Sequence, residues 1–169
     1  DVVIIDNSIR LKEEITSILK DVFMHTFRNS MDHGLETADV RKAAGKAITG
    51  RIDIDLEVKD DMLSISYCDD GKGLGLEHLY KKALENGTFT ADQEVSDQEI
   101  AELIFQSGCS TAESVTMVSG RGVGMDAIKR FIQRLGGDIS LEFKSERDEQ
   151  GFRRFSQVIT LPKEHCVEL

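Results

Sequence analysis

The stretch "RIDIDLEVKDDMLSISYC", residues 51–68, decides the fold because apolar and polar residues alternate along most of its length. Alternation with a period of two is typical of β-strands. The pattern stops at Lys59, Asp60 and Asp61 and resumes at Met62. The segment therefore predicts two strands that form a hairpin.

On the N-terminal side of this hairpin, the sequence predicts a strand and a long helix. The β-branched run "DVVIID", residues 1–6, is typical of a strand. From about Leu11 to Leu35 apolar residues recur at helical spacing, and Asp21 is where a break is most expected. We expect a core-facing stripe on this helix, formed by Phe23, Phe27, Met31 and Leu35.

The remaining elements complete an α+β pattern. The segment "TADVRKAAGK", residues 37–46, predicts a short helix that ends at Gly45. Further helices are expected at residues 77–86, 97–105 and 123–135, and the segments "DISLEFKS" and "RRFSQVITL" predict a second hairpin around residues 146–151. Because strands pair as hairpins with helices between them, we expect a two-layer sandwich with a mixed, mainly antiparallel sheet covered by helices on one face.

Composition limits the function. A chain of 169 residues is expected to form a single domain, 1–169. The net charge of −10 argues against a surface that wraps nucleic acid. We see no apolar run of the ~20 residues that a membrane span needs, and no signal peptide. Cys68, Cys109 and Cys166 share no metal-ligand spacing, which favours reduced thiols and a cytoplasmic protein. Because the chain begins with Asp1, we expect a piece of a longer protein.

Polar residues recur at helical spacing in "MHTFRNSMDHG", residues 24–34. His25, Asn29 and His33 are four residues apart, so they would lie along one side of a helix over ~12 Å. One interpretation is a solvent-facing side. The other is a functional stripe, because an Asn oxygen can bind Mg²⁺ and an imidazole can accept a proton near neutral pH.

Glycines gather in a few short stretches. Nine of the 14 glycines lie in "DDGKGLG", "SGCST", "SGRGVG" and "LGG". The run "SGRGVGMDAIKR", residues 119–130, leads from a glycine-rich loop into a helix, which favours a phosphate site at the helix N-terminus. A merely flexible loop remains the alternative.

Asp69 follows the second strand of the first hairpin and precedes Gly71 and Gly73. Asp and Gly are turn residues, so a turn explains them. Alternatively, Asp69 accepts a hydrogen bond from an exocyclic amine such as that of adenine. Taken together, the three segments predict one ligand, with its base near Asp69, its phosphates near residues 120–124 and a metal near Asn29.

Five segments in order resemble the GHKL ATPases, a group that includes histidine kinases, DNA gyrase and heat-shock chaperones. They are "HTFRNSMDHGLE", "RKAAGK", "DDGKGL", "IFQSGCSTAE" and "VSGRGVGMDAIKRFIQRLGG". Within that group they resemble most the ATP-binding catalytic domain of the CheA-type histidine kinases, over residues 1–161. The resemblance implies the Bergerat ATP-binding fold, with ATP and Mg²⁺ as cofactors.

The resemblance also implies residue roles. Asn29 would bind Mg²⁺, Asp69 would bind the adenine, and His25 and Lys82 would be catalytic groups near the phosphates. Ser110 and Thr111 would belong to a mobile lid. The full implied nucleotide-binding set is Asn29, Asp32, His33, Asp69, Gly71, Gly73, Ser110, Thr111, Gly120, Arg121, Gly122, Val123 and Gly124.

The implied activity is transfer of the ATP γ-phosphoryl group to a histidine on a separate phosphotransfer domain, in cis or in trans, because neither His78 nor His165 lies in a known acceptor motif. The implied partners are a response regulator downstream and a CheW-like adaptor with its receptor. The longer protein would be a homodimeric multidomain kinase without direct membrane insertion. Two alternatives remain: a regulatory pseudokinase module that binds nucleotide, and another GHKL ATPase.

Overall fold

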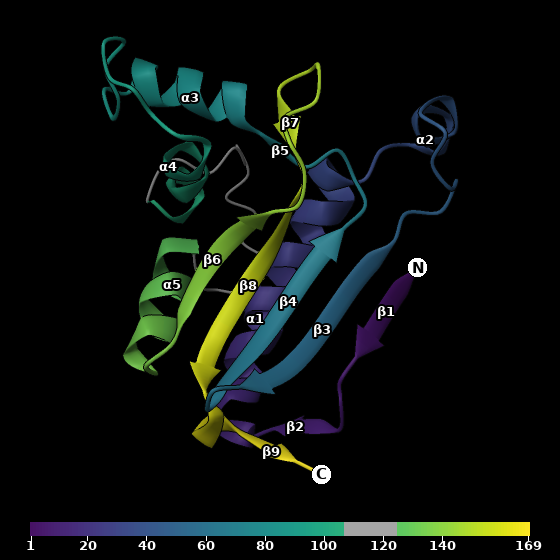
Figure 1. Ribbon diagram of the computed structural model, residues 1–169, viewed down its shortest axis with the longest axis vertical. Helices are drawn as coiled ribbons and strands as arrows, with labels where there is room; N and C mark the ends of the chain where they lie inside the picture. The colour runs from purple at the N-terminus through teal and green to yellow at the C-terminus, as the bar shows by residue number, and fades with distance from the viewer. Residues whose placement is uncertain (107–124) are drawn as a thin grey trace.

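The computed structural model describes residues 1–106 and 125–169, and its centre is a five-stranded sheet in the order β1–β3–β4–β8–β6 (Figure 1). The strands are β1 (Val2–Ile5), β3 (Ile52–Lys59), β4 (Met62–Asp69), β6 (Asp138–Phe143) and β8 (Phe155–Pro162). The pair β1–β3 is parallel, whereas β3–β4, β4–β8 and β8–β6 are antiparallel. The predicted mixed, mainly antiparallel sheet is confirmed.

Shorter strands and helices surround this sheet. The strands β2 (Ile9–Leu11) and β9 (Cys166–Glu168) form one small pair, and β5 (Leu74–Gly75) and β7 (Phe152–Arg153) form another. The helices are α1 (Glu13–Asn29), α2 (Ala38–Ala43), α3 (Leu76–Glu85), α4 (Asp97–Glu102) and α5 (Met125–Arg134). A π-helical turn, η1 (Ser30–Gly34), follows α1, and 3₁₀ turns form η2 (Leu103–Phe105) and η3 (Lys163–His165). Each predicted helix is present, apart from residues 123 and 124, which lie outside the described residues.

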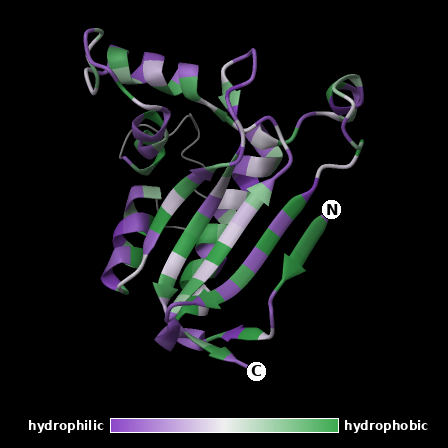
Figure 2. Cartoon of the chain, viewed as in Figure 1, coloured by the Kyte–Doolittle hydropathy of each residue, from purple (hydrophilic) through white to green (hydrophobic). Residues whose placement is uncertain are grey.

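The predicted hairpin of residues 51–68 is present, and its turn lies where the alternation stops. Ile52 lies opposite Asp69 and Lys59 lies opposite Met62. Asp60 and Asp61 form the turn with φ of 50° and 60°, a backbone region that Asp tolerates better than most residues. Apolar residues of β3 and β4 point to one face and polar residues to the other, and the resulting bands are visible along β3 (Figure 2).

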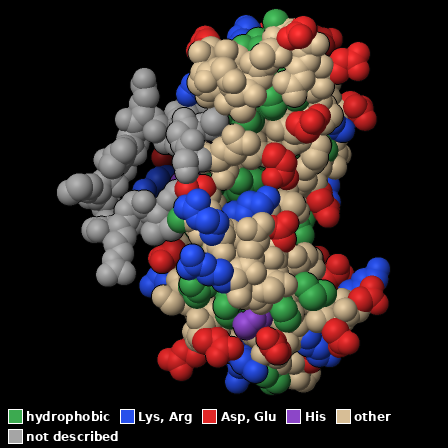
Figure 3. Space-filling view, turned by 90° about the vertical axis from the view of Figure 1, so that its left-hand side faces the viewer, with side chains coloured by type: hydrophobic (Ala, Val, Ile, Leu, Met, Phe, Trp, Pro, Cys, Tyr) green, Lys and Arg blue, Asp and Glu red, His purple; other side chains and the backbone are tan. Residues whose placement is uncertain are grey.

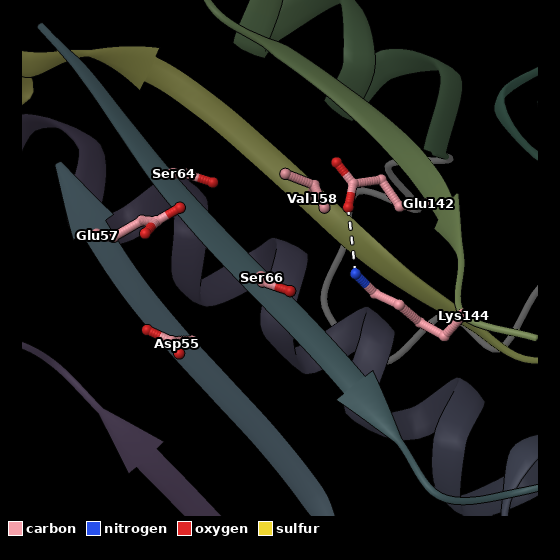
Figure 4. Close-up of a pocket in the computed structure, with 7 residues that line it drawn as sticks. All are labelled: Asp55, Glu57, Ser64, Ser66, Glu142, Lys144 and Val158. Atoms are coloured by element: carbon pink, nitrogen blue, oxygen red, sulfur yellow. Dashed lines mark hydrogen bonds and ion pairs between the residues drawn. The ribbon is translucent and has the colours of Figure 1, made fainter. Parts of the chain in front are cut away.

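The helices cover one face of the sheet. In Figure 1, α1 lies behind β4 and β8, and α5 lies beside β6. The opposite face is open and polar, with a shallow hollow of about 240 Å³ among Asp55, Glu57, Ser64, Ser66, Glu142, Lys144 and Val158 (Figure 4). The architecture is therefore the two-layer sandwich that was predicted, with its core between the sheet and the helices.

The predicted core stripe of α1 was wrong in part. The buried residues are Ile15, Leu19, Val22 and Thr26, whereas Phe23 and Phe27 lie at the border of the core. Met31 is 66% exposed, and Leu35 lies beyond the helical residues. A strict spacing of four residues advances about 40° around the helix at each step, so it leaves the core face, while the observed alternation of four and three stays on it. The helix is also unbroken at Asp21.

A buried arginine ties the segment between α1 and β3 to the end of β4. Arg41 is 1% exposed, and its Nη2 donates to Asp70 Oδ2 at 2.6 Å. Its Nε donates to the Ala47 carbonyl at 2.7 Å, and its Nη1 donates to Glu36 Oε2 at 3.2 Å. The Arg41 guanidinium therefore connects Glu36, which precedes α2, and Ala47, which follows α2, to the residue after β4.

A second cation completes this network. Lys46 Nζ donates to Glu36 Oε1 at 2.6 Å and to the Gly71 carbonyl at 3.1 Å. Burial acts to raise the pKa of Glu36 and of Asp70, but the hydrogen bonds from Lys46 and Arg41 outweigh it, so that both pKa values are lowered. Both carboxylates are therefore ionised at neutral pH, where they fix the loop that follows β4.

We predict that Arg41→Ala lowers the free energy of unfolding by about 3–5 kcal/mol, because it removes a buried guanidinium and with it the partner of Asp70, a partly buried carboxylate. Urea denaturation at pH 7 measures this change. The difference should narrow as the pH falls below the reference pKa values of 3.8 and 4.5, since the carboxylates of Asp70 and Glu36 then lose their charge in the native protein as well.

The matched control is Arg10→Ala, because Arg10 is exposed on β2 and has no ion pair within the described part of the chain. Its effect should stay within about 0.5 kcal/mol. Equal effects of the two substitutions would contradict the structural role of Arg41.

Candidate functional site

Asp69, at the end of β4, is held by neutral donors. It lies two residues after Tyr67, so both side chains point to the helix-covered face of the sheet. There the Ser30 hydroxyl donates to Asp69 Oδ2 at 2.6 Å, and the Gly71 amide donates to Oδ1 at 3.0 Å. Each carboxylate oxygen has two lone pairs, so Asp69 can still accept a hydrogen bond from a ligand.

Two hydrogen bonds lead from Tyr67 through Ser30 to Asp69, and in both of them the proton is donated toward Asp69. The Tyr67 hydroxyl donates to Ser30 Oγ at 2.8 Å, and both residues are 3% exposed. Burial raises the pKa of Tyr67 to about 12, against the opposing effect of the Ser30 hydrogen bond, and the charge of Asp69 adds to the rise. Tyr67 therefore stays protonated, and its donated hydrogen bond leaves the Ser30 proton for Asp69.

Sequence reasoning singled out neither Ser30 nor Tyr67. A signal for Tyr67 was present, because residues two apart on a strand share a face. Ser30 follows Thr26 by four residues, at the end of the buried side of α1, where a polar residue needs a partner.

A π-helical turn brings the end of α1 against the loop after β4. The Leu35 amide donates to the Ser30 carbonyl at 2.7 Å, which is the wider spacing of a π-helix, a feature often found at functional sites. The Lys72 amide donates to the Gly34 carbonyl at 3.1 Å. A Cβ at Gly71 would lie 2.3 Å from that carbonyl oxygen, so only glycine fits at position 71.

Position 73 also requires glycine, because of its backbone conformation and a close neighbour. Its φ is +89°, and a Cβ there would lie 2.4 Å from the Arg153 carbonyl oxygen. The expected approach of Gly71 and Gly73 to a base stays a prediction, because the contacts described for them are with the protein's own backbone.

The predicted polar side of α1 leads to this carboxylate. His25 is half-buried, whereas Asn29 is exposed and directly precedes Ser30. Burial lowers the pKa of His25, and the charge of Arg28 lowers it further, so its imidazole is neutral at pH 7 and can accept a proton. His33 and Asp32 are exposed on the π-helical turn, where the altered rotation takes His33 off the regular α-helical stripe.

Lys82 lies half-buried on α3. Its neighbour Lys81 pairs with Glu77 at 3.1 Å, whereas the Lys82 ammonium has no ion pair within the described residues. It is therefore a cation that an anionic ligand could use.

The other predicted site residues lie outside the described residues: Ser110, Thr111, Gly120, Arg121, Gly122, Val123 and Gly124. Helix α5 begins at Met125, directly after them. The phosphate site predicted at this helix N-terminus stays a prediction.

The described side chains offer few ligands for a metal ion. Among the described residues, no group of three or more His, Cys, Asp or Glu side chains is placed to hold a metal. An exposed Asn29 oxygen fits Mg²⁺ only together with waters and phosphate oxygens, which is how Mg²⁺ binds with nucleotides. No helix in the described part of the chain is long and apolar enough to cross a membrane.

Comparison with known proteins places this site in context. A family model described as "Histidine kinase-, DNA gyrase B-, and HSP90-like ATPase" matches residues 14–165. The chain is similar to the gliding motility regulatory protein of Myxococcus xanthus, with 38% identity over all of this chain and 22% of that protein. It is also similar to the chemotaxis protein CheA of Rhizobium meliloti, with 43% identity over 75% of this chain and 17% of that protein.

One further relative and one solved structure are also similar to this chain. The chemotaxis protein CheA of Salmonella typhimurium is 38% identical over 85% of this chain and 21% of its own length, so the chain spans only about a fifth of these relatives. Among solved structures, the catalytic domain of histidine kinase ThkA is 18% identical, with a TM-score of 0.43 over 87% of this chain and 67% of that chain.

We predict that Ser30→Ala lowers the free energy of unfolding by about 1–3 kcal/mol, because it removes the acceptor of buried Tyr67 and a donor of Asp69. Chemical denaturation with Ser66→Ala as the control measures this, since Ser66 lies on the open face of the sheet. An effect of Ser30→Ala as small as that of Ser66→Ala would contradict the hydrogen-bond chain.

Proposed function

Because this chain belongs to the family of histidine kinase-, DNA gyrase B- and HSP90-like ATPases, we propose that it is the ATP-binding catalytic domain of a CheA-like sensor histidine kinase. In this proposal it passes the γ-phosphoryl group of ATP to a histidine on a separate phosphotransfer domain. The observation that carries the proposal is the buried hydrogen-bond chain that presents Asp69 as an acceptor.

We assign adenine recognition to Asp69 because of the hydrogen bonds that its carboxylate accepts. Its carboxylate accepts hydrogen bonds from Ser30 and Gly71, and none of the ion pairs among the described residues involves it. An acceptor with spare lone pairs in a partly buried position suits the exocyclic amine of adenine and rejects a base that presents a carbonyl there. Asp32 and His33, on the exposed π-helical turn, would complete the nucleotide-binding set.

Phosphoryl transfer would use the polar residues of α1 and α3. The transition state is loose, so catalysis needs mainly positioning and charge neutralisation. Asn29 would hold Mg²⁺, which would supply positive charge at the phosphates, and the Lys82 ammonium would neutralise further phosphate charge. The neutral His25 imidazole would accept or orient the proton of the attacking group.

The acceptor histidine lies outside this chain in our proposal. His165 is 8% exposed in η3, at the far end of the sheet from the tip of β4 (Figure 1). His78 is exposed on α3, in a sequence without an acceptor motif. A separate domain, in cis or in trans, would therefore present the histidine.

The wider context is part of the same proposal. The CheA relatives favour a two-component signalling role, with a response regulator downstream and a CheW-like adaptor and receptor upstream. We also propose that residues 1–169 are a single domain of a longer, homodimeric, cytoplasmic kinase.

We predict that Mg·ATP binds at least tenfold more tightly than Mg·purine riboside triphosphate, which lacks the 6-amino group, because a hydrogen bond to a charged acceptor contributes about 1.5–3 kcal/mol. In Asp69→Asn this preference should disappear, since an amide replaces one acceptor oxygen with a donor. Isothermal titration calorimetry measures both affinities. A preference retained in the variant would contradict the role of Asp69, and a magnesium-free titration tests the metal.

We predict that His25→Gln slows transfer of radiolabelled phosphate to a histidine phosphotransfer domain by about 10²–10⁴-fold at pH 7. The ratio of native to variant rates should fall as the pH drops below the reference value of 6.5, because native His25 then gains a proton at its lowered pKa. Single-turnover rates give this ratio, in which titration of the acceptor cancels. A ratio that is independent of pH would contradict the role of His25, and nucleotide binding without any transfer to a matched domain would favour a regulatory pseudokinase.

A further inference from the structure

A groove separates α1 from α5 on the helix side of the molecule. It has a volume of about 370 Å³ and lies between the first half of α1 and the length of α5. Its lining residues are Ile18, Asp21, Ala127, Ile128, Arg130, Phe131 and Arg134. The floor is apolar, and one acidic and two basic residues stand at its rim.

The apolar floor is continuous with the core. Ile128 is 4% exposed and belongs to the core, and Ile18 packs against it while remaining partly exposed. Ala127 and Phe131 are also partly exposed along α5. Two neighbouring helices with an apolar furrow between them form the surface on which a third helix packs by ridges into grooves.

The rim is basic in a chain that is acidic overall. The chain carries a net charge of −10, yet the groove is lined by two basic residues of α5, Arg130 and Arg134, against one acidic residue, Asp21 of α1. Figure 3 looks onto this side and shows Lys and Arg side chains gathered near its middle, with hydrophobic side chains beside them. Arg130 is 63% exposed although it bonds to Asp126, and Arg134 has no ion pair within the described residues.

We propose that this groove binds an amphipathic helix of a partner protein. The apolar face of that helix would lie on Ile18 and Phe131, and its carboxylates would face Arg130 and Arg134. The charges choose this occupant, because basic residues at the rim of an apolar groove select acidic residues at the edge of the apolar face that fills it.

A second copy of this chain fits the groove less well. In a symmetric dimer the same surface meets itself, so the two Asp21 carboxylates would have to balance four arginines, Arg130 and Arg134 of each copy. The net charge of −10 on each copy would oppose association as well.

The groove also leads toward the candidate nucleotide site. Asp21, His25 and Asn29 follow each other in steps of four along α1, and Asp21 and Asn29 are separated by about 12 Å of helix. This step rests on the proposed function: a domain docked in the groove would stand beside the residues assigned to phosphoryl transfer, so we assign the docked helix to the domain that carries the acceptor histidine.

The test uses two 18-residue helical peptides as probes. Both carry leucines on one face, and the residues that flank this face are glutamates in one peptide and lysines in the other. Fluorescence anisotropy gives their affinities, and methyl NMR shifts of Ile18 and Ile128 locate the site. We expect the glutamate peptide to bind roughly tenfold more tightly than the lysine peptide. In the double variant Arg130→Glu/Arg134→Glu, this order should reverse.

The control is Arg10→Glu/Arg154→Glu, which makes the same change of charge at exposed positions outside the groove and should keep the original order. Mg·ATP affinity is measured on every variant. An unchanged ATP affinity together with a reversed order of peptide affinities supports helix binding in the groove. If the unmodified chain does not bind Mg·ATP, that result counts against the proposed function and not against helix binding in the groove.

Three outcomes would overturn the proposal. The first is equal affinity of the two peptides, or no shift at Ile18 and Ile128. The second is self-association in analytical ultracentrifugation that Arg134→Glu abolishes, because it would assign the groove to a second copy. The third is that the unmodified chain binds vesicles of anionic lipid but neither peptide, and that the double variant no longer binds the vesicles.

Discussion

The site depends on one carboxylate, Asp69, that is partly buried and has no cationic partner among residues 1–106 and 125–169. Asp69 and Asp70 are adjacent, yet they are stabilised in different ways. Asp70 accepts a hydrogen bond from the Arg41 guanidinium, so its charge serves the fold. Asp69 accepts hydrogen bonds from a hydroxyl and an amide, those of Ser30 and Gly71. Two donors do not fill the lone pairs of a carboxylate, so Asp69 keeps its capacity to accept a further hydrogen bond.

This arrangement requires α1 and the loop after β4 to approach more closely than side chains allow. The π-helical turn aims the Gly34 carbonyl at the loop, and Gly71 leaves room for it. A Cβ at Gly34 would also lie 3.0 Å from Asp69 Oδ2. The close approach of Gly34 and Gly71 connects the sheet layer to the helix layer. It allows Asp69, at the end of a strand, to accept a hydrogen bond from Ser30, which follows the end of a helix. Precise placement of Asp69 is thus a property of the fold and not of its own turn.

The elements that the sequence predicted well are those with a local pattern. Alternation gave the hairpin of β3 and β4, including the turn at Asp60 and Asp61, and it gave the pairing of β6 with β8. The core face of α1 was misplaced because a strict spacing of four was followed where the buried residues alternate spacings of four and three. Gly71 and Gly73 are explained by close approaches to the protein's own backbone, and their expected role beside a base stays a prediction.

Residues that act through distant partners could not be found in this way. Ser30 reaches Asp69 across 39 positions, and Arg41 reaches Asp70 across 29. The neighbouring sequence does not say which distant group either residue contacts. Their roles appear only when the chain is folded, because a buried polar group is explained by the partner that satisfies it. The segment predicted to bind phosphate, residues 120–124, lies outside the described residues, so its role stays a prediction from the glycine pattern and the resemblance.

The central claim is that Asp69 is the acceptor for the base of a nucleotide. A crystal structure of this chain with Mg²⁺ and a non-hydrolysable ATP analogue tests it most directly. The account predicts the 6-amino group of adenine within hydrogen-bond distance of the Asp69 carboxylate, the Ser30 and Gly71 hydrogen bonds retained, and Mg²⁺ on the Asn29 oxygen. A nucleotide bound elsewhere, for example in the hollow on the open face of the sheet, or an Asp69 carboxylate turned away from the base, would contradict it.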